Sequence, residues 1–180
     1  WCSSEMYVSA LATAGVSDAR IIVAAPYEVS GTAALTGVYL AYEDITGEAL
    51  DETAKLVGTQ ELSLTAKLAE QLGGYDSVEI VNELKLLLGE TKNMTDAQLR
   101  EEIRAVAKEF GVTLTDTQVE QLAGLCRSLE KLDPEALKEK VESVQDPLGK
   151  LGQAKEAVSG FFEGVKQGWN SGVNFFKGLF

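Results

Sequence analysis

Two similar motifs, TDAQL at residues 95–99 and TDTQV at 115–119, mark the beginnings of helices. In each motif the threonine can cap the helix, and the glutamine three positions later can return a hydrogen bond to the threonine backbone. Apolar residues at helical spacing follow, so the motifs predict helices over 96–110 and 116–131 joined by GVTL. Two units are too few for a solenoid repeat. Much of the chain is therefore expected to be helical.

Further helices are predicted where a capping residue precedes an apolar stripe and a glycine or proline follows it. The first two are 3–14, ended by Gly15, and 30–46, capped by Ser30 and ended by Gly47. Residues 51–73 form one helix, or two helices broken near Gly58. The last two are 76–88, capped by Asp76, and one that begins at Asp133-Pro134.

One run interrupts the helical pattern. RIIVAAP, residues 20–26, is rich in β-branched residues and is typical of a strand buried on both faces. We therefore expect an α+β fold that is mainly α-helical. It comprises a small strand-containing part over residues 1–50, a helical body over 51–146, and a hinge with a C-terminal amphipathic helix over 147–180. The strand's neighbours are expected from a missing N-terminal part of the same polypeptide, because the chain begins at Trp1 rather than at Met.

Composition excludes several classes of function. The chain has no histidine, which removes the common triads and zinc-ligand sets, and a net charge of -12 argues against nucleic-acid binding. Cys2 and Cys126 lack the CxxC spacing of a metal or redox site, and Cys126 lies in an apolar stripe that predicts burial. Adjacent carboxylates do not face each other on a helix. We predict no catalytic residues, metal or cofactor, and favour a protein without enzymatic activity.

The loop from Ser30 to Thr36 is the candidate ligand site. A predicted strand leads there into a helix start with small and hydroxyl residues, where free backbone N–H groups can hold an anion. Ser30, Gly31 and Thr32 are the candidate binding residues, although the loop lacks the lysine and second glycine of a P-loop. Capping is the alternative role for the two hydroxyls.

The tail differs in charge and composition. Residues 150–180 carry four basic and two acidic side chains, whereas the preceding part is strongly acidic. On a helical projection the aromatic and aliphatic residues cover one arc of about 120°. This contact face consists of Phe161, Phe162, Val165, Trp169, Val173, Phe176, Leu179 and Phe180. A packing flank consists of Gly160, Gly164, Gly168 and Gly172. Because glycine disfavours an isolated helix, the tail is expected to need a surface: its own core, a partner or second copy, or a membrane.

Residues 1–50 and the LTDTQ segment near 115 resemble the YpuA-like family, exported proteins of Gram-positive bacteria also described as domain of unknown function 1002. The matching hallmark positions are Tyr7, Ala10, Leu11, Thr13, Ala14, Gly15, Asp18, Ala19, Pro26, Val29, Ser30, Gly31, Thr32, Ala33, Ala34, Leu35, Thr36 and Gly37. The resemblance implies a secreted or extracytoplasmic, envelope-associated protein and a further domain before the hallmark. It transfers no catalytic residue.

Three functions follow as hypotheses. The first is an envelope-associated interaction protein whose C-terminal helix docks on a membrane, a wall component or a partner protein. The second is a ligand-binding or enzymatic domain centred on the Ser30–Thr36 loop. The third is a homo-oligomer assembled through the glycine flank of the tail.

Overall fold

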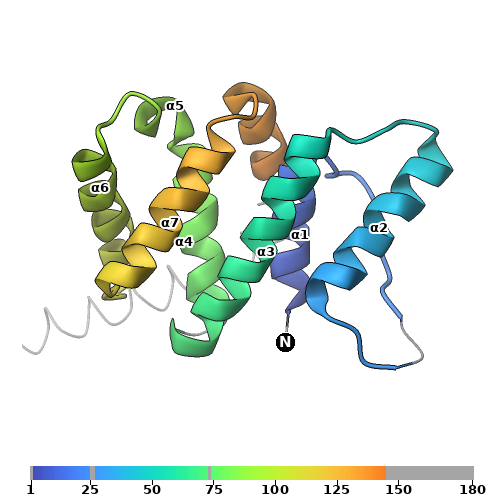
Figure 1. Ribbon diagram of the computed structural model, residues 1–180, viewed down its shortest axis with the longest axis horizontal. Coiled ribbons are helices and arrows are strands. Elements are labelled where there is room, and N and C mark those ends of the chain that lie inside the picture. Colours follow the sequence, from blue (N-terminus) through green and yellow to red (C-terminus); the bar gives the residue numbers. More distant parts are fainter. Residues whose placement is uncertain (1, 25–26, 73, 145–180) are drawn as a thin grey trace, which may run out of the picture. The chain divides into compact units, whose positions relative to one another are not determined.

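The computed structural model describes residues 2–24, 27–72 and 74–144, and helices form the framework of this part (Figure 1). The helices are α1 (Ser4–Thr13), α2 (Gly31–Thr46), α3 (Glu52–Leu72), α4 (Gly74–Leu86), α5 (Leu88–Thr91), α6 (Asp96–Glu109) and α7 (Asp116–Leu129), followed by a helical segment at 134–144. Contacts divide the chain into units at 1–144 and 145–180, and all described residues belong to the first. The predicted tail helix lies outside the described residues.

Helix starts agree with the capping signals. Thr95 Oγ1 accepts a hydrogen bond from Gln98 N at 3.3 Å, while Thr95 N donates to Gln98 Oε1 at 2.9 Å. Thr115 and Gln118 make the same reciprocal pair at 3.3 and 2.7 Å. The helices beginning at Asp133-Pro134 and after Ser30 are confirmed in the same way, by caps on Asp133 Oδ1 and Ser30 Oγ. Local side-chain chemistry therefore fixes these helix boundaries.

The predicted α+β class is wrong, because no strand occurs among the residues that the structure describes. The described part of the expected strand, residues 20–24, is irregular, and residues 17–24 make no backbone hydrogen bond to other described residues. A β-branched run becomes a strand only where another strand completes its ladder, and none lies beside this segment in the described chain.

Two details of the helices also differ from expectation. Gly58 does not break α3, which is continuous from Glu52 to Leu72. α4 already begins at Gly74, so Asp76 lies in its first turn and is not the cap. The helix dipole favours an acidic side chain both at the cap and in the first turn, so the sequence pattern alone did not distinguish these two positions for Asp76.

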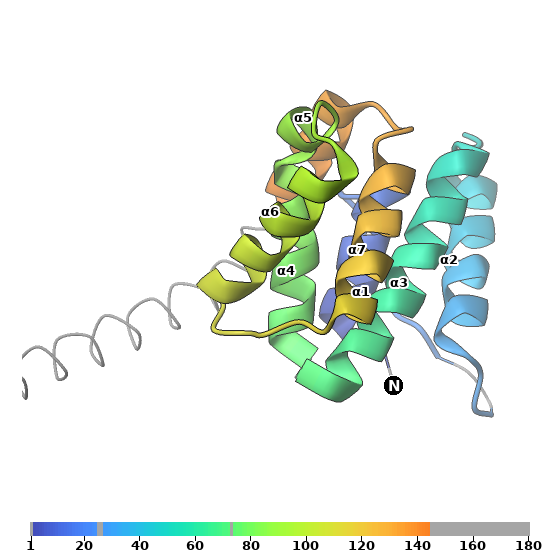
Figure 2. The ribbon, with the colours of Figure 1, turned by 60° about the vertical axis from the view of Figure 1, so that its left-hand side comes forward.

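Two apolar clusters meet at α3. One joins α1 and α2 to Leu62 of α3 and Val78 of α4. The other joins the remaining faces of α3 and α4 to α6, α7 and the 134–144 segment, and it contains Cys126, whose predicted burial is confirmed. Figures 1 and 2 both show α2 against α3, on the side away from α6. α2 buries only Leu35 and Tyr39 in this way, so most of its surface remains open.

Gly58 lies where α1 packs closely against α3. A Cβ at this position would lie 2.6 Å from the Ala10 carbonyl oxygen and 2.7 Å from the Tyr39 hydroxyl. Both distances are too short for carbon, so only glycine fits between these helices.

Within the described part of the chain, no helix is both long and apolar enough to span a bilayer.

Candidate functional site

A cluster of polar side chains lies buried where α1 meets α3 and α4. This buried polar cluster consists of Ser9, Thr13, Glu61, Asn82 and Lys85. Lys85 Nζ lies 2.7 Å from Glu61 Oε1 and donates to the Ser9 carbonyl oxygen at 2.9 Å. The second carboxylate oxygen of Glu61 accepts a hydrogen bond from Thr13 Oγ1. The cluster therefore joins three helices through one ion pair and its hydrogen-bonded shell.

The cluster contains a hydroxyl and an amine in the arrangement that some hydrolases use. Lys85 Nζ lies 2.8 Å from Ser9 Oγ, and burial lowers the pKa of Lys85 while the Glu61 carboxylate opposes that shift. A lysine with a lowered pKa can activate a serine hydroxyl as a nucleophile. However, Ser9 is only 1% exposed and the Lys85 side chain is fully enclosed, so a substrate has no route to the hydroxyl. In this structure the cluster connects helices.

The exposed apolar side chains lie elsewhere, on and beside α2. The large apolar side chains exposed in the described part of the chain are Ile22, Val23, Tyr27, Val29, Leu40, Ile45 and Leu56. All except Leu56 belong either to α2 or to the irregular residues that precede it, at 17–24 and 27–30. Ile22 and Ile45 are 80% and 83% exposed, which is unusual for residues of this size.

A groove separates the irregular segment from α2 and has a volume of about 790 Å³. We call it the α2 groove, and define it by residues 18–24 and Val29 on one side and by Ala33, Ala34, Gly37, Val38, Ala41, Tyr42, Ile45 and Thr46 of α2 on the other. The α2 residues form adjacent pairs that recur every four positions, so they cover one broad side of the helix next to the buried Leu35, and Val38 and Tyr42 also pack against the core. The exposed α2 residues along the groove are Ala33, Gly37, Ala41, Ile45 and Thr46.

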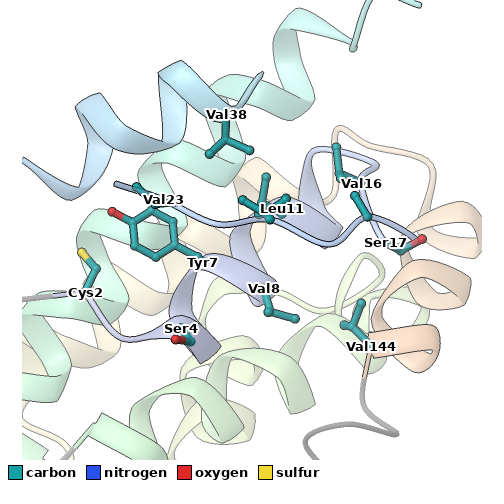
Figure 3. A pocket seen from close by; sticks show the side chains of 12 residues that line it. Cys2, Ser4, Tyr7, Val8, Leu11, Val16, Ser17, Val23, Val38 and Val144 are labelled. Carbon is teal, nitrogen blue, oxygen red and sulfur yellow. The ribbon is translucent and has the colours of Figure 1, made fainter. Parts of the chain in front are cut away.

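A smaller cavity of about 310 Å³ lies between α1, the irregular segment and α2. Figure 3 shows Val38 of α2 and Leu11 of α1 projecting toward it, with Tyr7 and Val23 close to each other at one side. The Tyr7 hydroxyl donates to the Gly31 carbonyl oxygen at 3.0 Å, which joins the start of α2 to α1. Apolar side chains of the irregular segment, Ile21 and Val23, thus line this cavity together with side chains of α1 and α2.

The predicted ligand residues lie at the start of α2, where their polar atoms serve the helix. Ser30 Oγ accepts from Ala33 N at 3.2 Å, and it lies 3.3 Å from Thr32 Oγ1. A Cβ on Gly31 would overlap Cys2 Sγ, so a larger residue at this position would displace the Cys2 side chain. These contacts account for the three residues locally, and a ligand at Ser30, Gly31 and Thr32 stays a prediction.

Charged side chains lie in and beside the α2 groove: Asp18 and Arg20 line it, Glu28 precedes the lining residue Val29, and Asp44 shares a helix face with Gly37 and Ala41. Asp18, Glu28 and Asp44 are exposed, and none forms an ion pair with another described residue. Arg20 is the one basic side chain among the described residues that line the groove. The groove is consequently apolar along its floor, and the charges at and beside it sum to negative.

No group of three or more histidine, cysteine, aspartate or glutamate side chains in the described residues is placed to hold a metal ion.

The predicted tail residues lie outside the described part of the chain, so the contact face at 161–180 and the glycine flank at 160–172 stay predictions. The buried polar cluster, by contrast, was not among the sequence-based candidates. Its signal is nevertheless present: Glu61 and Lys85 occupy positions at which the apolar stripes of their helices call for a hydrophobic residue.

Comparison with known proteins confirms the resemblance noted in the sequence. The model of a family described as "Protein of unknown function (DUF1002)" matches residues 1–146. The chain is also similar to "Uncharacterized protein YpuA" of Bacillus subtilis (strain 168), with 34% identity over 186 aligned residues. That alignment covers 97% of this chain but 62% of the relative, so the chain spans less than two thirds of the relative's length. No solved structure matches the chain. The chain belongs to the DUF1002 family of proteins of unknown function.

Proposed function

We propose that this protein is a non-catalytic binding protein of the cell envelope, which recognises another macromolecule through the α2 groove. The observation that carries the proposal is the gathering of exposed large apolar side chains at this groove. Burying one such side chain contributes about 1.5–3 kcal/mol, so a surface with several of them gains substantially when a partner covers it. Contiguous apolar surface on a folded domain is a mark of an interaction site.

Two further features support a binding role over catalysis. The one nucleophile–amine pair of the buried polar cluster is closed to substrate. The Ser30 hydroxyl at the start of α2 caps that helix by accepting from Ala33 N, and the Thr32 hydroxyl lies 3.3 Å from it. The resemblance to exported proteins supports the extracytoplasmic location in this proposal. Fractionation of cells that produce the protein from its natural gene tests the location, and recovery with the cytoplasmic proteins would contradict it.

Site-specific photo-crosslinking in intact cells tests the binding surface. A photoreactive residue replaces Ile45 in the groove, and the matched control replaces Leu56, which is 70% exposed on α3 and lies outside the groove. We expect a defined adduct from position 45 that disappears when Gly37→Leu is added, and none from position 56. No adduct at 45, or the same adducts from both positions, would show that the groove is not the binding surface.

The tail supplies a second contact in this proposal. Its aromatic face and reversed charge suit the interface of a membrane, where tryptophan, phenylalanine and lysine are favoured. Co-sedimentation with liposomes compares the full chain with a form ending at Gly149, and equal partitioning of the two removes the membrane role. Light scattering of the Gly164→Leu, Gly168→Leu double variant addresses self-assembly, since loss of an oligomer is expected only if the glycine flank forms the contact.

A further inference from the structure

We infer that the partner of the α2 groove is a basic amphipathic helix, an inference that rests on the proposed function. The first argument is steric. Ala33, Gly37 and Ala41 follow one another at four-residue intervals along the open face of α2, and all three are exposed. A Cβ placed on Gly37 would meet no atom within 4 Å, so the space above the middle of this face is empty. Small side chains in such a row let a second helix pack at the short end of the usual 8–10 Å interaxial range.

The second argument is the apolar content of the groove walls. The exposed side chains of Ile22 and Val23 line the side of the groove formed by the irregular segment, and exposed Ile45 lines the other side near the C-terminal end of α2. A helix with large apolar residues at intervals of three and four would insert them between these walls and cover both. This is the helix-in-groove form of peptide recognition. The groove is lined over some four turns of α2, from Ala33 to Thr46, which matches a helical segment better than a small molecule.

The third argument is charge. Asp18 and Arg20 line the groove, while the exposed Asp44 lies on the same face of α2 as Gly37 and Ala41 and the exposed Glu28 precedes Val29, so the charges at and beside the groove sum to negative. A helix with lysine or arginine beside its apolar face would place opposite charge against these carboxylates, which favours correct association. The same carboxylates repel an anionic lipid surface. The charge pattern therefore selects a basic helix over a membrane at this groove.

Fluorescence anisotropy with model peptides tests the inference on the full chain. The probe is a labelled peptide of about 18 residues, or five helical turns, with leucine and alanine on one face and lysine on the other. Its sibling carries glutamate in place of every lysine. We expect the lysine peptide to bind and the glutamate peptide to bind at least about tenfold more weakly.

Variants of the chain locate the binding. Gly37→Leu fills the floor of the groove and should weaken binding of the lysine peptide at least about tenfold. Gly124→Leu is the matched control, because Gly124 is also an exposed helical glycine with nothing within 4 Å of a Cβ position. Asp44→Lys should weaken binding about two- to fivefold, and more at low salt, whereas Glu139→Lys on the 134–144 segment should leave it unchanged.

Three results would overturn the inference: equal binding of the two peptides, no binding of either, or equal sensitivity to Gly37→Leu and Gly124→Leu. Phosphatidylcholine vesicles provide the remaining arm. Vesicle binding that Gly37→Leu abolishes, without peptide binding, would assign the groove to a lipid surface. If an adduct still forms at position 45 in cells while the peptides fail, the groove keeps its binding role and only the chemistry of the partner is refuted.

Discussion

Replacing Lys85 with methionine would remove the cation of the buried polar cluster while keeping a long, flexible side chain in its place. Lys85 Nζ is 2.7 Å from Glu61 Oε1 and also donates to the oxygen atoms of Ser9. The Lys85 and Glu61 side chains are 0% and 1% exposed, so water cannot replace the lost partner. The variant would leave a carboxylate in the interior with only neutral hydroxyl donors.

Breaking a buried ion pair by removing one partner costs about 3–5 kcal/mol. A domain of this size is stable by about 5–15 kcal/mol in total, so Lys85→Met should remove about a fifth or more of the free energy of unfolding. Removing both charges has a different effect. In the Glu61→Leu, Lys85→Met double variant, Ser9 Oγ keeps an acceptor in Asn82 Oδ1 at 2.7 Å, and Thr13 Oγ1 keeps the Ser9 carbonyl oxygen at 3.3 Å. We expect the double variant to recover most of the loss.

Urea unfolding followed by far-ultraviolet circular dichroism measures all four members of this double-mutant cycle. The matched control is Lys55→Met, because Lys55 also pairs with two carboxylates, on Glu43 and Glu52, but does so at the surface. Lys55→Met should lower the free energy of unfolding clearly less than Lys85→Met does. The argument is refuted if Lys85→Met lowers stability by less than about 1 kcal/mol, or if the double variant is as unstable as the two single losses added together.

Three other outcomes are expected. Gly58→Ala should lower the free energy of unfolding by about 1–3 kcal/mol, because the alanine Cβ would collide with a backbone carbonyl of α1. In the same assay, Gly124→Ala should raise the free energy of unfolding by up to about 1 kcal/mol, because alanine favours the helix and its Cβ meets no atom. Alkylation of the native chain at mildly alkaline pH should modify Cys2 but not Cys126, since burial raises the pKa of Cys126 to about 12; equal labelling in mass spectra would contradict this. Burial raises the pKa of Glu83 above its ordinary value of 4.5, and a carboxylate on α6 reinforces this shift. The stability that protonated Glu83 contributes is therefore present below pH 4.5 and is lost as the pH rises through the folded-state pKa. Glu83→Gln should therefore raise the urea midpoint at neutral pH and leave it unchanged below pH 4.5, and a gain of the same size at both pH values would point to another cause.

Features that depend on a few neighbouring residues were predictable from the sequence. The caps at Thr95, Thr115 and Asp133 were found because the residues that make each hydrogen bond lie within three positions of each other. Features that depend on distant neighbours were not. The RIIVAAP run has strand propensity, but propensity decides only where a sheet is available to receive it. Gly58 read as a possible helix break, although its role is set by α1, almost fifty residues earlier in the chain.

The candidate sites divide in the same way. Ser30 was recognised as a capping residue, and its bond to Ala33 N needs only the local sequence. The α2 groove was not found, because its exposure depends on which face of α2 meets α3. Glu61 and Lys85 were missed because charged residues usually lie on solvated faces, and their contact joins α3 to α4 across the interior.

The close crossing at Gly58 also determines which side chains can form the polar cluster. Glu61 follows Gly58 by three residues on the same face of α3, and Ser9 adjoins Ala10, whose carbonyl faces that glycine. Because the two backbones nearly touch, side chains as short as serine and threonine reach the Glu61 carboxylate directly. Sliding α1 by one turn along α3 would separate both hydroxyls from that carboxylate and leave them buried without it. Gly58 and Glu61 together thus specify the register of α1, which an apolar contact alone would leave far less defined.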